Sequence, residues 1–426
     1  MTTDSTAAHR AVDAVWRIES ARIIAGLARL VRDVGLAEEL AQDALVAALE
    51  QWPAEGIPAK PGAWLMLTAR HRAIDRIRRD ERLAGKLALL GRELEAEQGG
   101  APAEFEAAED DARIDDDLLR LMFVSCHPLL PADARVALTL RLLGGLTTGE
   151  IARGLLTTEA AIAKRITRAK RTLAASQVPF EVPSAQDRPA RLASVLEVIY
   201  LIFNEGYSAM AGDDWMRPAL CTEALRLGRV LAGLIPGEPE VHGLVALMEI
   251  QASRIPARLD SGGRPVPLPE QNRGRWDPLL VRRGFTALLQ AQRLRRPPGP
   301  YVLQAAIAAC HARARTGDET DWRQIAMLYE ALAILTPSPV VELNRAVAVA
   351  MAGDIEEGLR IVDGLAAAPA LAGYHYLPSV RGDLLARLGR HAEAAGEFRK
   401  AASLTRNGPE RATLLRRAGD CETRWD

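Results

Sequence analysis

The 426-residue sequence predicts an all-α protein, with two small helical modules followed by a large helical-repeat domain. Aromatic residues make up only 4% of the chain, while alanine, leucine and arginine recur throughout it, a mixture that favours helices over sheets. The pairs Gly317-Asp318, Gly353-Asp354 and Gly389-Arg390 recur every 36 residues between alanine- and leucine-rich runs. A repeat of this length with a turn glycine indicates stacked helix pairs in the C-terminal region.

The overall composition is that of an ordinary globular protein. Hydrophobic residues make up 48% of the chain and charged residues 26%, which excludes a disordered chain and a fibre. The formal net charge is −1, so a field that attracts nucleic acid can only be local. The four cysteines lie far apart without metal-ligand spacing, and no apolar run approaches the length of a membrane span. We therefore expect reduced, buried thiols in a cytoplasmic protein without a metal or cofactor.

Charge is distributed unevenly along the first half of the chain. Residues 60–92 hold nine Lys/Arg against three Asp/Glu, and residues 153–171 hold six against one. The segment between them, residues 93–117, holds eleven acids and one arginine, and a proline-rich stretch follows the second basic segment. These shifts predict modules at residues 9–92 and 118–178, an acidic linker at residues 93–117, and a C-terminal region at residues 188–426.

The sharpest motif lies at residues 147–173. Its pattern predicts a short helix at residues 149–154, a turn, and a longer helix capped by Thr157 or Thr158. One face of the longer helix is an apolar stripe of Ile162, Ile166, Ala169 and Leu173. The opposite face carries Lys164, Arg168 and Arg171, with Arg165 and Thr167 beside them. This is the layout of a helix-turn-helix, in which one face packs and the other enters the major groove. A basic surface helix on a bundle is the alternative, but cap, spacing and charge together favour DNA binding.

A second basic helix is predicted at residues 61–83, beginning at Pro61. Arg72, Arg76 and Arg79 share one face of it, and Leu67, Ile74 and Ile77 lie opposite. Alone, this helix indicates a phosphate-binding face. A core position for Trp64 and a plain surface position for His71 are the alternatives to a functional role.

Residues 9–176 resemble a bacterial RNA polymerase sigma factor of the extracytoplasmic-function type. The resemblance lies in the order of an acidic amphipathic helix at residues 33–53, the segment PGAWLMLTARHRAIDRIRR, an acidic linker and the helix-turn-helix EIARGLLTTEAAIAKRITRAKRTL. The remainder resembles the long helical, tetratricopeptide-like extension found in one branch of these factors. In particular, ARLGRHAEAAGEFRKA is similar to the second half of a tetratricopeptide repeat.

The resemblance implies a partner for each segment of the two modules. The clamp of core RNA polymerase is expected to bind the acidic helix through Glu38, Glu39, Gln42 and Asp43. The −10 promoter element is expected to be melted and read by Trp64, His71, Arg72, Arg76 and Arg79. The −35 element is expected to be read by Thr158, Lys164, Arg165, Thr167, Arg168 and Arg171. His71 stands where these factors usually carry asparagine, so base preference at the −10 element does not transfer.

The C-terminal region is expected to regulate the sigma modules. Its long Gly/Pro-rich loop holds Asp260, Gly262, Gly263 and Arg264, which suit an intramolecular regulatory contact, whereas a solvated linker is the plain alternative. A protein partner on the repeats is also possible in this scheme. Truncation near Ser184 is expected to alter transcription while leaving both DNA-reading modules folded.

Three functions compete on the sequence alone. A sigma factor that binds core polymerase and promoter DNA needs no catalytic group, and it explains both basic helices. A helix-turn-helix regulator with a ligand- or protein-sensing repeat domain leaves residues 33–79 unexplained. An enzyme is disfavoured because no GxSxG, P-loop or HExxH motif is present, and the Glu205, Asp213 and Asp214 cluster fits a loop between helices.

Overall fold

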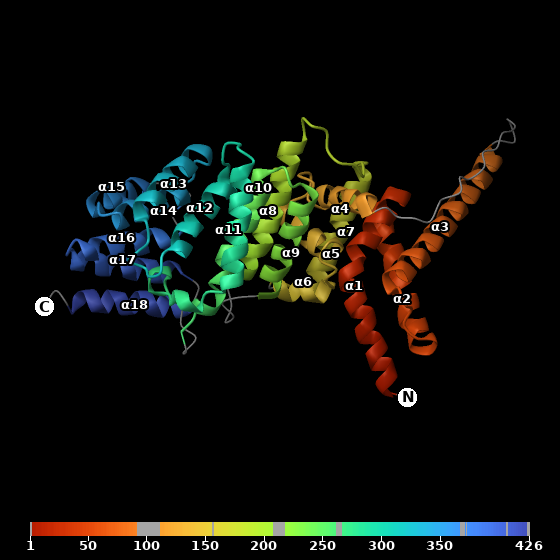
Figure 1. Cartoon of the computed structure of the whole chain (residues 1–426), viewed down its shortest axis with the longest axis horizontal. Coiled ribbons are helices and arrows are strands. Elements are labelled where there is room, and N and C mark those ends of the chain that lie inside the picture. Colours follow the sequence, from red (N-terminus) through yellow and green to blue (C-terminus); the bar gives the residue numbers. More distant parts are fainter. Residues whose placement is uncertain are drawn as a thin grey trace. The chain divides into compact units, whose positions relative to one another are not determined.

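The computed structural model describes residues 2–91, 111–155, 157–207, 218–260, 266–366, 371, 373–405 and 408–423. Within these ranges the chain forms α-helices, three short 3-10 turns and no β-strand, which confirms the prediction of an all-α protein (Figure 1). Contacts divide the chain into two compact units, residues 1–201 and 202–426. The boundary falls inside one helix, α8 (Arg188–Tyr207).

The first unit opens with three helices that pack around alanine-rich faces. They are α1 (Thr2–Val31), α2 (Val34–Glu55) and α3 (Pro61–Gly91). Asp33 caps α2 by accepting a hydrogen bond from the Leu36 amide at 2.8 Å, and Pro61 begins α3 as the sequence predicts. Small buried residues such as Ala37, Ala41 and Ala44 let α2 lie close to α1.

Four shorter helices complete the sigma-like part of the first unit. They are α4 (Asp111–Ser125), α5 (Ala132–Leu142), α6 (Thr148–Gly154) and α7 (Glu159–Ala175). Because α4 begins at Asp111, the end of the expected acidic linker is already helical. Asp117, assigned to that linker, is buried and pairs with Arg29 at 2.9 Å and Arg120 at 2.6 Å. The linker residues 92–110 lie outside the described part of the chain.

The first half of α8 is bonded to α4 and α5. Ser194 donates to the Cys126 carbonyl at 2.6 Å, and Arg191 donates to the Phe123 carbonyl at 2.7 Å. Arg135 of α5 pairs with Glu197 of α8 at 2.9 Å. Cutting the chain near Ser184 removes all of these partners of the second module. That both modules stay folded after this truncation remains a prediction.

The second unit is organised around α10 (Pro239–Ser253), which is buried on nearly every face. It contacts α9 (Pro218–Leu234), α11 (Pro278–Arg293) and α12 (Pro300–Arg313). Two glycines permit these contacts. A Cβ at Gly243 would lie 2.6 Å from the Val302 amide nitrogen, and one at Gly284 would lie 2.5 Å from Ile250 Cγ1. Three 3-10 turns, Ile255–Ala257, Leu268–Glu270 and Arg273–Arg275, connect α10 to α11.

Helix pairs follow, as the 36-residue period predicts. The remaining helices are α13 (Trp322–Leu335), α14 (Pro339–Met351), α15 (Ile355–Leu365), α16 (Tyr376–Arg387), α17 (His391–Leu404) and α18 (Gly408–Glu422). Gly353 turns α14 into α15 with φ +118°, and Gly389 turns α16 into α17 with φ +77°, conformations that favour glycine. Gly317 occupies the equivalent place before α13 without a positive φ. Glycine is required there for a different reason, because a Cβ at Gly317 would clash with the Pro269 carbonyl oxygen.

The four cysteines are all buried and free, as expected. Burial raises the pKa of the Cys126 thiol to about 11, which keeps it protonated and unreactive.

Candidate nucleic-acid interface

The helix-turn-helix is fixed by caps at both of its helices. Thr147 accepts from the Glu150 amide at 3.1 Å, while the Glu150 carboxylate accepts from the Thr147 amide at 2.9 Å, forming a capping box at α6. Thr158 caps α7 by accepting from the Ala161 amide at 3.2 Å. Thr148 donates to Glu159 at 2.6 Å, which ties the starts of the two helices together.

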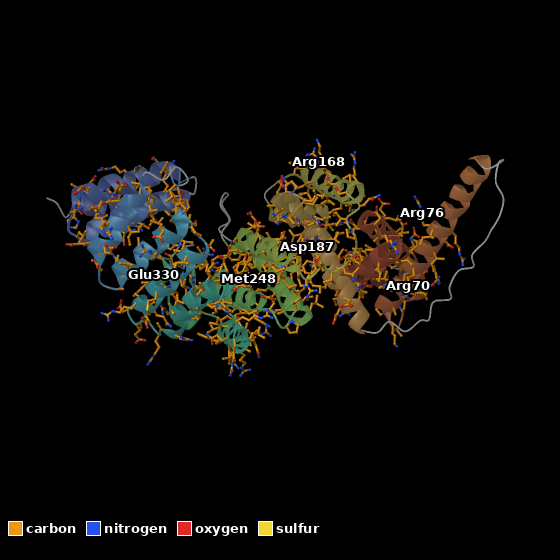
Figure 2. The ribbon with its side chains drawn as sticks, turned by 90° about the horizontal axis from the view of Figure 1, so that it is seen from above. Arg70, Arg76, Arg168, Asp187, Met248 and Glu330 are labelled. Atoms are coloured by element: carbon orange, nitrogen blue, oxygen red, sulfur yellow. The ribbon has the colours of Figure 1, made fainter. Side chains whose placement is uncertain are left out.

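The packing of α7 leaves one polar face in solvent. Ile162, Ile166, Ala169 and Leu173 are all buried, which confirms the predicted apolar stripe. Lys164, Thr167, Arg168 and Arg171 are exposed, and none of them has a side-chain partner among the described residues. Figure 2 shows Arg168 on the outer surface of this module. Arg165 differs from its neighbours because it pairs with Asp133 of α5 at 3.0 Å.

The second basic helix, α3, packs through a face other than the one expected. Leu65, Ala69 and Ala73 are buried, whereas Leu67 is 54% exposed and Ile74 is 36% exposed. The apolar face predicted from Leu67, Ile74 and Ile77 is therefore not the packed face. The packed face is formed by Leu65, Ala69 and Ala73, which are spaced four residues apart.

The predicted −10 residues divide into a half-buried pair and an exposed set. Trp64 is half-buried and packs edge-on against Trp52 of α2, with ring centroids 5.6 Å apart. Arg72 is half-buried as well. His71, Arg76 and Arg79 are exposed on the same helix, and Figure 2 shows Arg70 and Arg76 on this module.

The acidic residues of α2 lie on two different faces. Glu38 is only 3% exposed, and its carboxylate pairs with Arg141 of α5 at 2.5 Å and with Lys170 of α7. Gln42 donates to the same carboxylate at 2.5 Å. Glu39 and Asp43 instead point into solvent. Of the four residues expected to bind polymerase, only Glu39 and Asp43 are therefore exposed. Arg141 and Lys170 of the second module pair with the buried Glu38, and Gln42 is hydrogen-bonded to the same carboxylate.

Further contacts join the two modules of the first unit. Arg17 pairs with Glu150 at 2.7 Å and Arg29 with Asp117 at 2.9 Å. At the α5–α6 turn, a Cβ on Gly145 would lie 2.7 Å from the Ser20 hydroxyl of α1. The modules are thus packed on each other through charged pairs and one close backbone approach.

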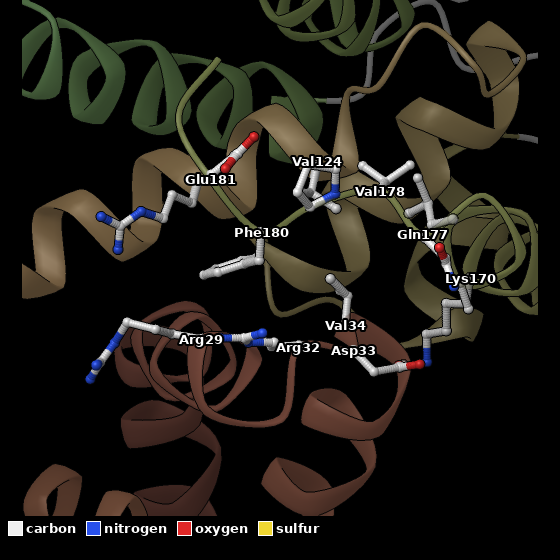
Figure 3. A pocket seen from close by; sticks show the side chains of 15 residues that line it. Arg29, Arg32, Asp33, Val34, Val124, Lys170, Gln177, Val178, Phe180 and Glu181 are labelled. Carbon is white, nitrogen blue, oxygen red and sulfur yellow. The ribbon is translucent and has the colours of Figure 1, made fainter. Parts of the chain in front are cut away.

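A cavity of about 860 Å³ remains where the modules meet. Figure 3 shows the α1–α2 corner on one side of it, with α7 and the following segment on the other. The labelled lining residues are Arg29, Arg32, Asp33, Val34, Val124, Lys170, Gln177, Val178, Phe180 and Glu181. Three cations that line it form ion pairs within the first unit: Arg29 and Arg120 with Asp117, and Lys170 with Glu38.

Two family models match these modules. Sigma-70 region 2 matches residues 18–83, within α1–α3, and Sigma-70, region 4 matches residues 120–173, which include the helix-turn-helix. The ECF RNA polymerase sigma factor SigK of Mycobacterium ulcerans (strain Agy99) is 30% identical over 158 residues, covering 36% of this chain and 78% of the relative. The chain belongs to the extracytoplasmic-function sigma factor family. The resemblance read from the sequence is confirmed, and the family is one of transcription initiation factors rather than enzymes.

The helical extension of this sigma factor is included in the match to a relative that covers nearly the whole chain. An uncharacterized protein of Rhizobium meliloti (strain 1021) is 46% identical over 388 residues, covering 91% of this chain and 90% of the relative. A family of unknown function, DUF6596, matches residues 191–292. The crystal structure of yeast Tom70 covers 92% of this chain and 82% of its own at 12% identity, with a TM-score of 0.31, too low to support an argument. None of the described helices is both long and apolar enough to cross a membrane.

Some residues singled out in the sequence lie outside the described part of this sigma factor. They are Gly262, Gly263 and Arg264 of the regulatory loop, and Asp213 and Asp214 of the acidic cluster. Asp260 and Glu205 are described, and both have interactions within the chain.

The exposed face of α2 extends beyond the residues predicted from the sequence. Val46 is 51% exposed and Glu50 is exposed, and both continue the line of Glu39 and Asp43 at helical spacing. The spacing i, i+4, i+7, i+11 was visible in the sequence. The sequence did not show whether Glu38 and Gln42 or Glu39 and Asp43 face solvent. That depends on Arg141 and Lys170, which bind the Glu38 carboxylate.

Proposed function

We propose that this sigma factor binds core RNA polymerase through α2, recognises promoter DNA through α7 and α3, and opens it for transcription initiation. The observation that supports this most is the α7 face of Lys164, Thr167, Arg168 and Arg171, which is exposed while the opposite stripe is fully buried. A recognition helix needs this division, since one face must dock and the other must reach base edges and phosphates.

The polymerase contact is assigned to the exposed line of Glu39, Asp43, Val46 and Glu50. An acidic surface with one apolar side chain suits a protein partner, because the charges guide association and the apolar contact adds affinity. Glu38 and Gln42 take no part in this proposal while the two modules are packed together.

The α3 helix supplies the expected DNA-opening surface. His71, Arg76 and Arg79 are exposed, and the exposed Leu67 and Ile74 add apolar side chains to the same helix. Arginines supply affinity by releasing counterions from phosphates. Apolar side chains can contact the faces of unstacked bases. In duplex DNA these faces are covered by the neighbouring bases.

The extension is assigned a regulatory role on transcription. Its support is its size, its binding surfaces without catalytic motifs, and the bonds of Arg191 and Ser194 in α8 to region 4. Asp260, Gly262, Gly263 and Arg264 remain the proposed regulatory contact, and a protein partner on the helix pairs remains proposed as well.

The test separates a sigma factor from a helix-turn-helix regulator. Transcripts that respond to overexpression of the chain define the promoter, and the purified chain is then mixed with that duplex with and without core polymerase. We expect a specific complex and run-off transcription only when core polymerase is present. A specific complex formed by the chain alone, without any transcription on adding polymerase, would support the regulator instead.

A further inference from the structure

The second unit carries a concentrated arginine surface that promoter reading by α3 and α7 does not use. Residues 273–315 contain nine arginines, no lysine and one acid, Asp277, in a chain whose net charge is −1. These residues form the turn before α11, α11 itself and α12. The imbalance is larger than in either basic segment of the sigma modules.

Four of the arginines meet around an open cavity of about 580 Å³ between the start of α11 and the end of α12. We call this surface the arginine pocket, and define it by Arg273, Trp276, Arg282, Phe285, Arg313 and Arg315. Its floor is aromatic, because Trp276 and Phe285 both line it.

The pocket is held in shape by Arg273. This side chain donates to the His311 carbonyl at 2.7 Å, the Ala314 carbonyl at 2.9 Å and the Thr320 hydroxyl at 2.8 Å. Those bonds satisfy carbonyls at the C-terminal end of α12 and join it to the turn before α11. The Arg313 guanidinium lies over the Phe285 ring, 5.6 Å from its centroid, which fixes a second cation.

Two cations of the arginine pocket form no ion pair with the described residues. Arg282 and Arg315 are exposed, and neither side chain has a partner among the described residues. The two neighbouring carboxylates, those of Asp277 and Glu319, accept hydrogen bonds from backbone amides and keep their negative charge. Asp277 accepts from the Leu279 and Leu280 amides at 2.8 and 3.1 Å, and Glu319 accepts from the Arg315 amide at 3.0 Å.

We propose that the arginine pocket binds the phosphate backbone of promoter DNA, as a third DNA contact beyond regions 2 and 4. Duplex DNA presents regularly spaced phosphates, and arginine forks match phosphate oxygens in a bidentate geometry. An open cavity walled by cations admits a continuous backbone better than a single small anion. The inference rests on the proposed function, because that function brings DNA to the chain.

The test compares two double variants of the full chain assembled with core polymerase. The first is Arg282→Gln with Arg315→Gln. The matched control is Arg360→Gln with Arg390→Gln, which removes the same charge from exposed arginines of the same unit that pair with Glu357 and Glu393. Binding to the promoter fragment is followed by fluorescence anisotropy between 50 and 200 mM salt, and circular dichroism checks folding.

For the pocket variant we expect the negative slope of log K against log salt to become shallower by about 2, since each lost phosphate contact removes about 0.9 from its magnitude. The loss of affinity should be the same for the cognate promoter and for one with a scrambled −35 element. The control should keep the wild-type slope.

An unchanged slope, or an equal fall in the control, overturns the proposal. Weaker assembly with core polymerase at an unchanged DNA slope also overturns it, and identifies a protein-docking surface instead. Failure of the proposed function is recognised separately, because in that case the wild-type holoenzyme forms no promoter complex. The comparison of the two variants tests the arginine pocket alone.

Discussion

The carboxylate of Glu38, in the helix assigned to polymerase binding, forms an ion pair with Lys170 of the recognition helix α7. Arg141 of α5 pairs with the same carboxylate at 2.5 Å, and Glu38 is almost entirely buried. Side chains of regions 2 and 4 thus meet in a buried charged cluster of Glu38, Arg141 and Lys170. Removing one partner from such a cluster is costly, because the others are left without a counter-charge out of water.

Replacing Glu38 is therefore expected to destabilise the first unit. Glu38→Gln should lower the free energy of unfolding by about 3–5 kcal/mol, the usual cost of breaking a buried pair. Urea unfolding followed by circular dichroism measures this. In a double-mutant cycle with Lys170→Gln, the coupling energy should exceed about 1 kcal/mol.

The neighbouring Glu39→Gln is the control for that experiment, because Glu39 is exposed and should change stability by less than about 0.5 kcal/mol. Equal effects of the two substitutions would mean that the ion pair contributes nothing to the packing of the modules.

Polymerase binding should depend on the exposed acids of α2. Charge reversal by Glu39→Lys with Asp43→Lys should weaken the association of the chain with core polymerase at least tenfold, because both side chains lie on the exposed line of the helix. A pull-down with titrated core polymerase measures this. The fold should be unaffected, and binding that withstands both reversals would place the contact elsewhere.

Promoter affinity should distinguish Arg168 from Arg165 on the same helix. Arg168→Ala should cost about 1–3 kcal/mol of holoenzyme binding to the cognate promoter if Arg168 reads a base edge, and Lys164→Ala should act similarly. Arg165→Ala should cost less, since its guanidinium is paired with Asp133 at 3.0 Å. Quantitative gel shifts on one promoter compare the three. A larger loss for Arg165→Ala than for Arg168→Ala contradicts the assignment of the groove-facing side.

Truncation should show where region 4 ends. A chain ending at Asp187 loses Ser194 and Glu197, which bond to the Cys126 carbonyl and to Arg135. It should therefore unfold at a lower temperature than a chain ending at Tyr207, which retains α8. Thermal unfolding followed by circular dichroism tests this, and identical melting of the two chains would show that α8 adds nothing to region 4.

Stability of the second unit should fall in mild acid because of His311. Burial, together with the charges of Arg254 and Arg273, lowers the pKa of His311 to about 4. An unfolded histidine has a pKa near 6.5, so between these values the unfolded chain binds more protons and stability falls as the pH drops from 6.5 towards 4. The full loss is on the order of 3 kcal/mol.

His311→Gln should flatten the pH dependence of unfolding in that window, as measured by urea titrations at several pH values. The exposed His71→Gln serves as control and should leave the curve unchanged. A slope that persists in the His311 variant would assign the acid sensitivity to other groups.

Local sequence signals were sufficient to predict most helices of this sigma factor and the buried face of α7. Spacing, capping and backbone freedom predict the buried stripe from Ile162 to Leu173, Pro61 at the start of α3 and the turn glycines Gly353 and Gly389. They also narrow the cap of α7 to Thr157 or Thr158, and the structure shows that it is Thr158. These depend on residues within a few positions of one another.

Which polar side chains are exposed and which are paired depends on contacts between helices that are distant in the sequence. Glu38 and Glu39 are equivalent in the sequence, yet one is buried against Arg141 and Lys170 and the other is exposed. Arg165 pairs with Asp133, whereas Arg168 on the same helix is exposed. Leu67 is in solvent because Leu65 and Ala69 form the packed face of α3. Each outcome depends on partners far along the chain, and no helical period encodes the position of those partners in space.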